Sequence, residues 1–214
     1  MNSKLAEIDS IVGHHTVSIK RLLELSKDED WEVRCCAIEK LGEYTITVCA
    51  DNIKKRMKQG LSDTNEFVRS SCIEALVQWK DTQYLDEIID CLGDESFVVR
   101  IAAAEAIGFF GDSSKAKYLE EHILRITDDN EQVFCYFGLF LLGKYHYLES
   151  LLDSLYSDYY RTRCAVANLL ISCTNDQNRP RILNRLREAL AQEKTRAAYL
   201  NIKNAIEELE NSRK

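Results

Sequence analysis

The cysteines and histidines are the residues best able to supply a nucleophile or a metal ligand. The chain has eight cysteines and four histidines among 214 residues. No two cysteines have the CxxC spacing of a zinc site, and no HExxH pair occurs. Disulfide frameworks are typical of small secreted chains, so reduced, buried packing is the expected role of these cysteines. The sequence therefore predicts no metal and no cofactor.

Catalytic and phosphate-binding motifs do not occur in the sequence. Serine or cysteine catalysis needs a nucleophile oriented by a base, and there is no GxSxG elbow. No glycine-rich phosphate loop of the GxGxxG or GxxxxGK[ST] kind occurs either. The sequence therefore gives no reason to expect an enzyme.

The charge balance narrows the choice of partner. With 28 basic and 35 acidic side chains, the formal net charge is −7. A phosphate-backbone binder needs a positive footprint, so we expect no nucleic-acid binding, whereas a basic protein would be attracted. No apolar run reaches the ~18 residues of a membrane span. The N-terminus lacks a basic stretch followed by an apolar run, so we expect a cytoplasmic protein that does not bind membranes.

The sequence contains an internal repeat, which determines where its helices begin. Three segments align on a Val-Arg pair, at Val33–Arg34, Val68–Arg69 and Val99–Arg100, and Val133 takes the valine position of a fourth. These valines are separated by 35, 31 and 34 residues. Aspartate lies six residues before the arginine position, a helix N-cap residue four before it, and a large aliphatic residue seven after it. One helix is thus expected to start at the same place in every repeat.

The later repeats are more degenerate. Phe134 takes the arginine position of the fourth repeat. A fifth copy begins at Asp158, with Thr162 in the arginine position and Leu169 in the aliphatic one. A sixth copy is expected near residues 194–209.

Amphipathic stretches with helical spacing separate the repeats, at residues 17–26, 51–61, 82–92, 114–126, 145–156 and 179–191. Each repeat is therefore a helix, a turn and a helix. A two-helix unit cannot bury its own apolar face, so neighbouring repeats must stack. We predict one all-α domain over residues 1–214, with a capping helix in residues 1–13 and a polar tail at 207–214.

These recurring positions resemble those of HEAT repeats, particularly the short HEAT-like units of phycobilin lyases. Their pattern is a turn Asp, then Val-Arg, then Ala-rich spacing to Leu-Gly. The third repeat matches it closely with Asp94, Val99–Arg100, Ala102–Ala104 and Ile107–Gly108. The resemblance covers about residues 17–170 and is strong in the first three full repeats.

The resemblance implies a right-handed α-solenoid of about six helical hairpins. It also implies an Asp–Arg ladder between adjacent repeats, which is a packing role that suits arginine. Because Phe134 and Thr162 depart from the pattern, we expect the ladder to fail in the C-terminal half.

Some enzymes share the fold that the resemblance implies. A pigment-handling protein could hold its pigment through Cys35, Cys36 or Cys164, although packing is the favoured role for these cysteines. Iron-binding HEAT-repeat hydroxylases use His-Glu pairs, whereas this chain has only the reversed Glu121–His122. HEAT-like DNA glycosylases need a cationic groove.

In such stacks, the second helix of each repeat lines the concave face. On that helix, positions two, five and nine residues after the arginine are expected to be exposed. An aromatic run between Phe134 and Tyr160 adds tyrosines, which are frequent in interface hot spots. The predicted partner-binding residues are Glu39, Glu43, Glu74, Gln78, Glu105, Phe109, Tyr136, Tyr159 and Tyr160, and Leu139 is expected on the same exposed line.

We predict a non-catalytic scaffold that binds a basic protein through this acidic and aromatic groove. A sharper version is a bacterial immunity protein that neutralises a basic toxin. One alternative is a HEAT-scaffold enzyme or lyase-like pigment-handling protein. Another is a subunit of a larger assembly, and the oligomeric state stays open.

Overall fold

The computed structural model describes residues 3–13, 15–45 and 49–211, and every regular element in these ranges is a helix. Residues 1–2 of the predicted capping helix and residues 212–214 of the predicted polar tail lie outside the described residues. The chain divides into two compact units, Met1–Phe110 and Gly111–Lys214. The all-α solenoid prediction is confirmed, with six helical hairpins.

The first unit contains α1 (Ser3–Ser10), α2 (Thr16–Leu25), α3 (Trp31–Gly42), α4 (Ala50–Gly60), α5 (Glu66–Gln78), α6 (Leu85–Asp90) and α7 (Phe97–Phe110). The second unit contains α8 (Ala116–Ile123), α9 (Asp129–Leu141), α10 (Tyr147–Ser154), α11 (Tyr160–Ser172), α12 (Arg179–Gln192) and α13 (Arg196–Asn211). Short 3-10 turns flank α6 and precede α8, at Thr82–Tyr84, Cys91–Gly93 and Ser113–Lys115.

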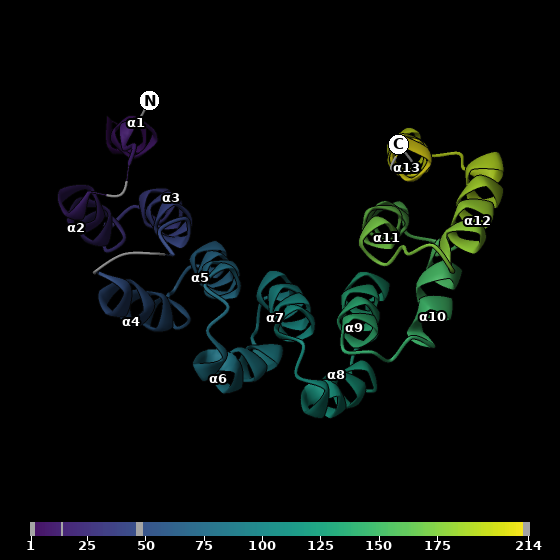
Figure 1. Cartoon of the computed structure of the whole chain (residues 1–214), viewed down its shortest axis with the longest axis horizontal. Helices are drawn as coiled ribbons and strands as arrows, with labels where there is room; N and C mark the ends of the chain where they lie inside the picture. The colour runs from purple at the N-terminus through teal and green to yellow at the C-terminus, as the bar shows by residue number, and fades with distance from the viewer. Residues whose placement is uncertain (1–2, 14, 46–48, 212–214) are drawn as a thin grey trace. The chain divides into compact units, whose positions relative to one another are not determined.

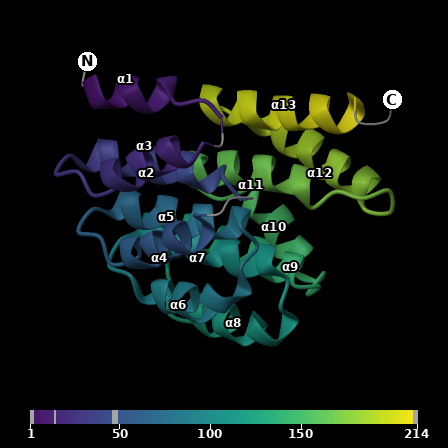
Figure 2. The ribbon, with the colours of Figure 1, turned by 60° about the vertical axis from the view of Figure 1, so that its left-hand side comes forward.

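The hairpins of the first unit form two rows of helices. The second helices, α3, α5 and α7, lie side by side in one row, and α2, α4 and α6 form the other (Figure 1). Figure 2 shows the same helices closer to lengthwise. Val33, Val68 and Val99 are fully buried between the rows. Each such side chain contributes about 1.5–3 kcal/mol by leaving water, so the shared core stabilises hairpins that could not stand alone.

The second unit repeats this arrangement. Helix α11 contacts both α9 and α13, while α8, α10 and α12 pack on their hairpin partners. Its core contains Phe137, Leu151, Leu152, Val166 and Leu186, all essentially buried. The apolar spacing that predicted these helices is thus the spacing of the buried side chains.

Arg34 and Arg69 of the Val-Arg pairs each join two loops. The Arg34 guanidinium donates to the carbonyl oxygen of Asp28, six residues earlier, at 2.8 Å. Its Nε and Nη2 donate to both carboxylate oxygens of Asp63, at 2.9 and 2.7 Å. Arg69 does the same with Asp63 O at 2.7 Å and with the Asp94 carboxylate at 2.8 and 2.7 Å. The ladder implied by the resemblance is present in the first unit, with the bidentate geometry of strong ion pairs.

The expectation that the ladder fails in the C-terminal half is wrong for the fifth repeat. Arg163, and not Thr162, takes the arginine position of the fifth repeat. It donates to Ser157 O, six residues earlier, at 2.6 Å, and to both carboxylate oxygens of Glu193 at 2.6 and 2.8 Å. Thr162 instead takes the preceding valine position and is 1% exposed. Because threonine has nearly the shape of valine, Thr-Arg replaces Val-Arg, and the sequence alignment was displaced by one residue.

The predicted alignment of the fourth repeat is wrong by two residues. Gln132, and not Phe134, takes the arginine position, since its amide nitrogen donates to Ile126 O, six residues earlier, at 3.0 Å. Asp128 caps α9, two residues before the predicted cap. Leu139 then falls in the aliphatic column and is fully buried, so the expectation that it is exposed is wrong.

The same displacement places Glu131 in the buried valine column, where it is 1% exposed. A carboxylate in the core is costly unless it is paired. His122 of α8 supplies the partner, with its Nε2 at 2.7 Å from Glu131 Oε1. The fourth hairpin is therefore held by a buried hydrogen bond between His122 and Glu131 that sequence reasoning missed.

The two ends of the described chain are both helical. Helix α1 packs on α3 and buries Ile8, and Lys4 forms an ion pair with Asp28 at 2.6 Å. Residues 207–211 of the predicted polar tail continue α13, and Leu209 is buried. The prediction of a single domain over the whole chain stays a prediction.

Candidate functional site

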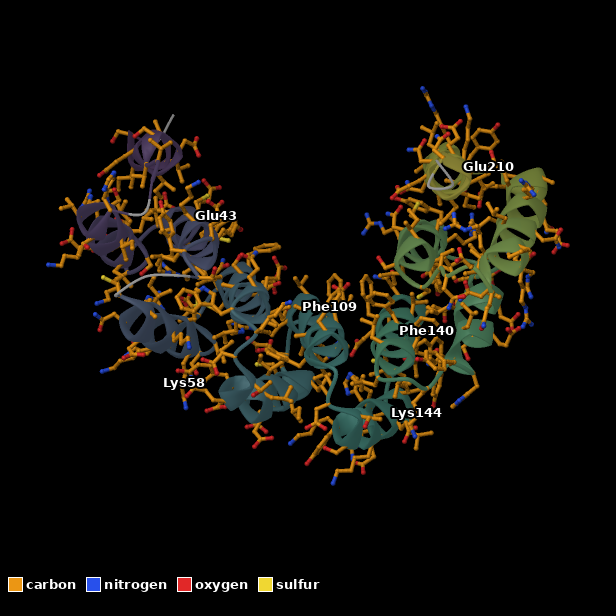
Figure 3. The ribbon with its side chains drawn as sticks, viewed as in Figure 1. Glu43, Lys58, Phe109, Phe140, Lys144 and Glu210 are labelled. Atoms are coloured by element: carbon orange, nitrogen blue, oxygen red, sulfur yellow. The ribbon has the colours of Figure 1, made fainter. Side chains whose placement is uncertain are left out.

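The first unit carries six of the predicted binding residues along one row of helices. They occupy matching positions and are Glu39 and Glu43 of α3, Glu74 and Gln78 of α5, and Glu105 and Phe109 of α7. All are exposed except Glu105, which is half-buried. Figure 3 shows Glu43 and Phe109 on the side of the row away from α4 and α6, and Lys58 of α4 on the opposite side. We call the surface formed by these six residues the acidic face.

Glu39 contacts the neighbouring helix. The hydroxyl of Ser71 in α5 donates to Glu39 Oε1 at 3.1 Å, and the Cys35 thiol donates to the same oxygen at 3.3 Å. The Cys35 and Ser71 side chains are themselves 3.0 Å apart. The carboxylate is thus oriented across the contact between α3 and α5.

The carboxylates of successive helices affect one another. Burial raises the pKa of Glu74, and the charge of Glu39 raises it further. Burial and the charge of Glu74 raise the pKa of Glu105 to about 7. Within the described ranges, no basic side chain forms a salt bridge with any of the three. The three glutamates therefore form a row of carboxylates that no described basic side chain neutralises.

Glu43 differs from these three because it has a partner. Lys40, one turn earlier on α3, forms an ion pair with it at 2.8 Å. An exposed pair of this kind contributes little energy, so Lys40 can release Glu43 at small cost.

An aromatic column beside the acidic row was missed by sequence reasoning. Trp31, Phe67 and Phe97 lie in the first turns of α3, α5 and α7, and are 38%, 45% and 52% exposed. Trp31 and Phe67 stack with ring centroids 5.4 Å apart. The signal was available, since all three lie two or three residues before an arginine of the ladder. Exposed aromatic side chains on successive neighbouring helices favour an interaction surface.

The remaining predicted residues belong to the second unit. Tyr159 and Tyr160 lie at the start of α11 and are 67% and 41% exposed. Tyr136 is half-buried and stacks on Tyr147 of α10, with ring centroids 5.7 Å apart. It lines a cavity of about 400 Å³ whose wall includes Asp129 and Asp153.

The thiols are poorly suited to nucleophilic chemistry. Burial raises the pKa of Cys35 to about 12 and also raises the pKa values of Cys36 and Cys164. A thiol with a raised pKa contains little of the reactive thiolate at neutral pH. In the part of the chain that the structure describes, no group of three or more His, Cys, Asp or Glu side chains could hold a metal ion.

The excess negative charge lies in one unit. Residues 1–110 contain 13 basic and 20 acidic side chains, a formal charge of −7, whereas residues 111–214 contain 15 of each. The acidic face therefore belongs to the unit that carries the whole net charge. Separately, none of the described helices is long and apolar enough to cross a membrane.

Two family profiles match the sequence, one described as HEAT repeats over residues 53–133 and one as HEAT repeat over 19–47. Together they cover about half of the chain. A comparison with curated proteins finds no match.

Solved structures show the same fold at low sequence identity. The complex of CpcE and CpcF of phycocyanin lyase from Nostoc sp. PCC7120 matches with a TM-score of 0.54 and 16% identity, over 94% of this chain and 97% of that one. The YibA protein of Escherichia coli matches with a TM-score of 0.53 and 20% identity, over 98% and 81%. Yeast importin-β (Kap95p) matches with a TM-score of 0.53 and 13% identity, over 97% of this chain but only 30% of that one.

These likenesses establish the fold alone. The repeat profiles, the six hairpins and the Asp–Arg ladder together assign the family. The chain is a HEAT-repeat protein.

Proposed function

We propose that this chain is a non-catalytic binding protein that recognises a basic protein partner through the acidic face of its first unit. The observation that carries the proposal is the row of Glu39, Glu74 and Glu105, one on each of three adjacent helices. The charge of Glu39 raises the pKa of Glu74, and the charge of Glu74 raises the pKa of Glu105. Like charges held together in this way destabilise the free protein, and a cationic partner would relieve their repulsion.

The relatives in fold support a binding role. CpcE and CpcF were solved as a complex, and Kap95p was also solved with RanGDP, where it matches this chain with a TM-score of 0.54 and 13% identity. Repeat stacks bury their cores between neighbours and leave an extended surface for a partner. That surface in the first unit is acidic and bordered by aromatic side chains.

A sharper form of the proposal is an immunity protein that neutralises a basic toxin. The support for it is the acidity of the face and the net charge of −7. Co-expression with a toxin encoded beside this chain would restore growth under this hypothesis. Growth arrest despite equal expression would exclude that toxin as the partner.

The alternatives have weaker support. A lyase-like, pigment-handling role draws only on the fold shared with CpcE and CpcF, and the thiol pKa values disfavour covalent attachment. A pigment-handling protein would absorb visible light after purification from its host. A subunit of a larger assembly would show a mass in solution above that of the 24.7 kDa chain.

Two matched triple variants test the proposal. Glu39→Gln, Glu74→Gln and Glu105→Gln remove three charges from the acidic face. Glu24→Gln, Asp51→Asn and Asp90→Asn remove three charges from α2, α4 and α6 in the other row of the same unit.

The tagged chain and both variants would be used to capture partners from extracts of the source organism. We expect a basic protein that the wild type and the second triple variant retain and the first triple variant loses. Retention of the same protein by all three would contradict the proposal.

A further inference from the structure

The spacing of the acidic row fits one kind of peptide backbone. Neighbouring packed helices have axes about 8–10 Å apart. Helices α3 with α5, and α5 with α7, are such neighbours, and each presents one glutamate from the same position. The row therefore offers one glutamate from each helix, and the helix axes are expected to follow one another at steps of about 8–10 Å.

Three regular backbones can be compared with this step. An extended strand places side chains on the same face every two residues, about 6.7 Å apart, or every four, about 13 Å apart. An α-helix repeats a face every seven residues, about 10.5 Å apart. Polyproline II has three residues per turn and a rise of about 3.1 Å, so its face repeats every 9.3 Å or so. Only polyproline II falls inside the range set by the helices.

The aromatic column supplies a second feature of such a site. Proline-rich segments in the polyproline II form dock against exposed aromatic side chains. Trp31, Phe67 and Phe97 present such side chains on the same three helices. Phe67 lies one turn before Ser71, whose hydroxyl contacts Glu39, so the aromatic pair and the carboxylate border the same contact between α3 and α5.

Resting on the proposed function, we propose that the acidic face binds a segment of the partner in the polyproline II conformation, with a basic side chain at every third residue. Three such side chains meet Glu39, Glu74 and Glu105 in turn. The intervening residues, proline among them, pack on the aromatic column. Arginine suits the site better than lysine, because its guanidinium pairs with carboxylates in a bidentate fashion and stacks on aromatic rings.

Composition-matched peptides test this spacing. One nine-residue peptide has three Arg-Pro-Pro repeats. The control has the same three arginines and six prolines, with arginine at positions one, three and five. Both are blocked at their ends. The readout is the fluorescence of Trp31 in the full chain carrying Trp79→Phe, which removes the other tryptophan.

We expect the Arg-Pro-Pro peptide to bind about tenfold more tightly than the control at low salt. That preference should disappear in the Glu39→Gln, Glu74→Gln and Glu105→Gln variant. Equal binding of the two peptides, tighter binding of the control, or no binding of either would each overturn the proposal. The proposed function would stand separately on the loss of the captured protein by the same triple variant.

Discussion

Glu131 takes the buried position that Val33, Val68, Val99 or Thr162 takes in other repeats, and His122 of α8 lies against it. Their nitrogen and oxygen are 2.7 Å apart, and neither side chain has much access to water. Removing one partner of such a pair is destabilising because the other stays buried without it, whereas replacing both with apolar groups can be neutral or stabilising.

The prediction is a large coupling between these two residues. His122→Leu alone should lower the free energy of unfolding by about 3–5 kcal/mol, because the buried carboxylate of Glu131 loses its hydrogen-bond partner on α8. Glu131→Val should also destabilise, and the double variant should recover most of the loss. Urea denaturation of the four proteins measures the cycle. Additive losses in the double variant would show that the pair is not coupled.

Glu105 makes the free protein sensitive to pH. Burial raises its pKa from the ordinary 4.5 to about 7, so the folded state disfavours the ionised form. Its contribution to stability is fully present below about pH 4.5 and is lost as the pH rises through about 7.

Glu105→Gln should therefore stabilise the chain at pH 8, by at most about 3 kcal/mol, and should have little effect at pH 4. Denaturation midpoints at the two pH values check this. A variant that is less stable than the wild type at pH 8 would show that Glu105 has a favourable partner there.

The exposure of a residue could be predicted from the sequence where a polar side chain also lay at a repeat position expected to face water. Glu39 and Glu74 were expected on an exposed line and are exposed. Leu139 was misplaced and Glu131 was missed, because Val133–Phe134 resembles the repeat pattern more closely than Glu131–Gln132 does. Burial of a glutamate becomes visible only when the histidine that pairs with it is located in space.

One side-chain contact recurs at the start of the second helix of the repeats. In five repeats, the arginine position donates to the carbonyl oxygen six residues earlier, from Arg34, Arg69, Arg100, Gln132 and Arg163. This contact fixes the loop before each second helix. It identifies the repeat register more reliably than the apolar pattern does.

Mutation tests the assignment of Arg163 to the arginine position of the fifth repeat. Arg163→Gln should lower the free energy of unfolding by about 2–4 kcal/mol, because Glu193 loses a nearly buried partner. Arg161, two residues earlier and exposed, serves as the control, and Arg161→Gln should change stability by less than about 0.5 kcal/mol. Equal effects of the two variants would refute the assignment.

The same ion pair has a defined pH dependence. Hydrogen bonds from Arg163 lower the pKa of Glu193 to about 2. A lowered pKa contributes stability above the ordinary value of 4.5, and that stability is lost as the pH falls through about 2. Glu193→Gln should therefore destabilise the chain at pH 7 and have little effect near pH 2, as measured by thermal unfolding.

Helix positions were more predictable than loop contacts. The predicted helices at 51–61 and 179–191 lie within a residue of α4 and α12. Apolar spacing is a local property of the chain, so it can be read from the sequence. The carboxylate partners of the ladder arginines lie in loops about 25–30 residues away, and a displacement of one residue in the alignment conceals them.

At the scale of the whole molecule, charge is distributed unevenly. The first unit has a formal charge of −7 and the second has none. Net charge alone would attract a basic partner to any surface of the first unit, whereas we assign the attraction to one face of α3, α5 and α7. Ionic strength separates these possibilities, since charges within an interface determine how steeply affinity falls with salt.

The most direct test is the salt dependence of the dissociation constant for the captured partner. It would be measured for the wild type and for the two triple variants, each of which replaces three carboxylates on one of the two rows of the first unit. The acidic-face variant should bind at least about tenfold more weakly at low salt and show a flatter dependence, while the other variant follows the wild type. Identical salt dependences for the two variants would contradict the assignment of binding to the acidic face.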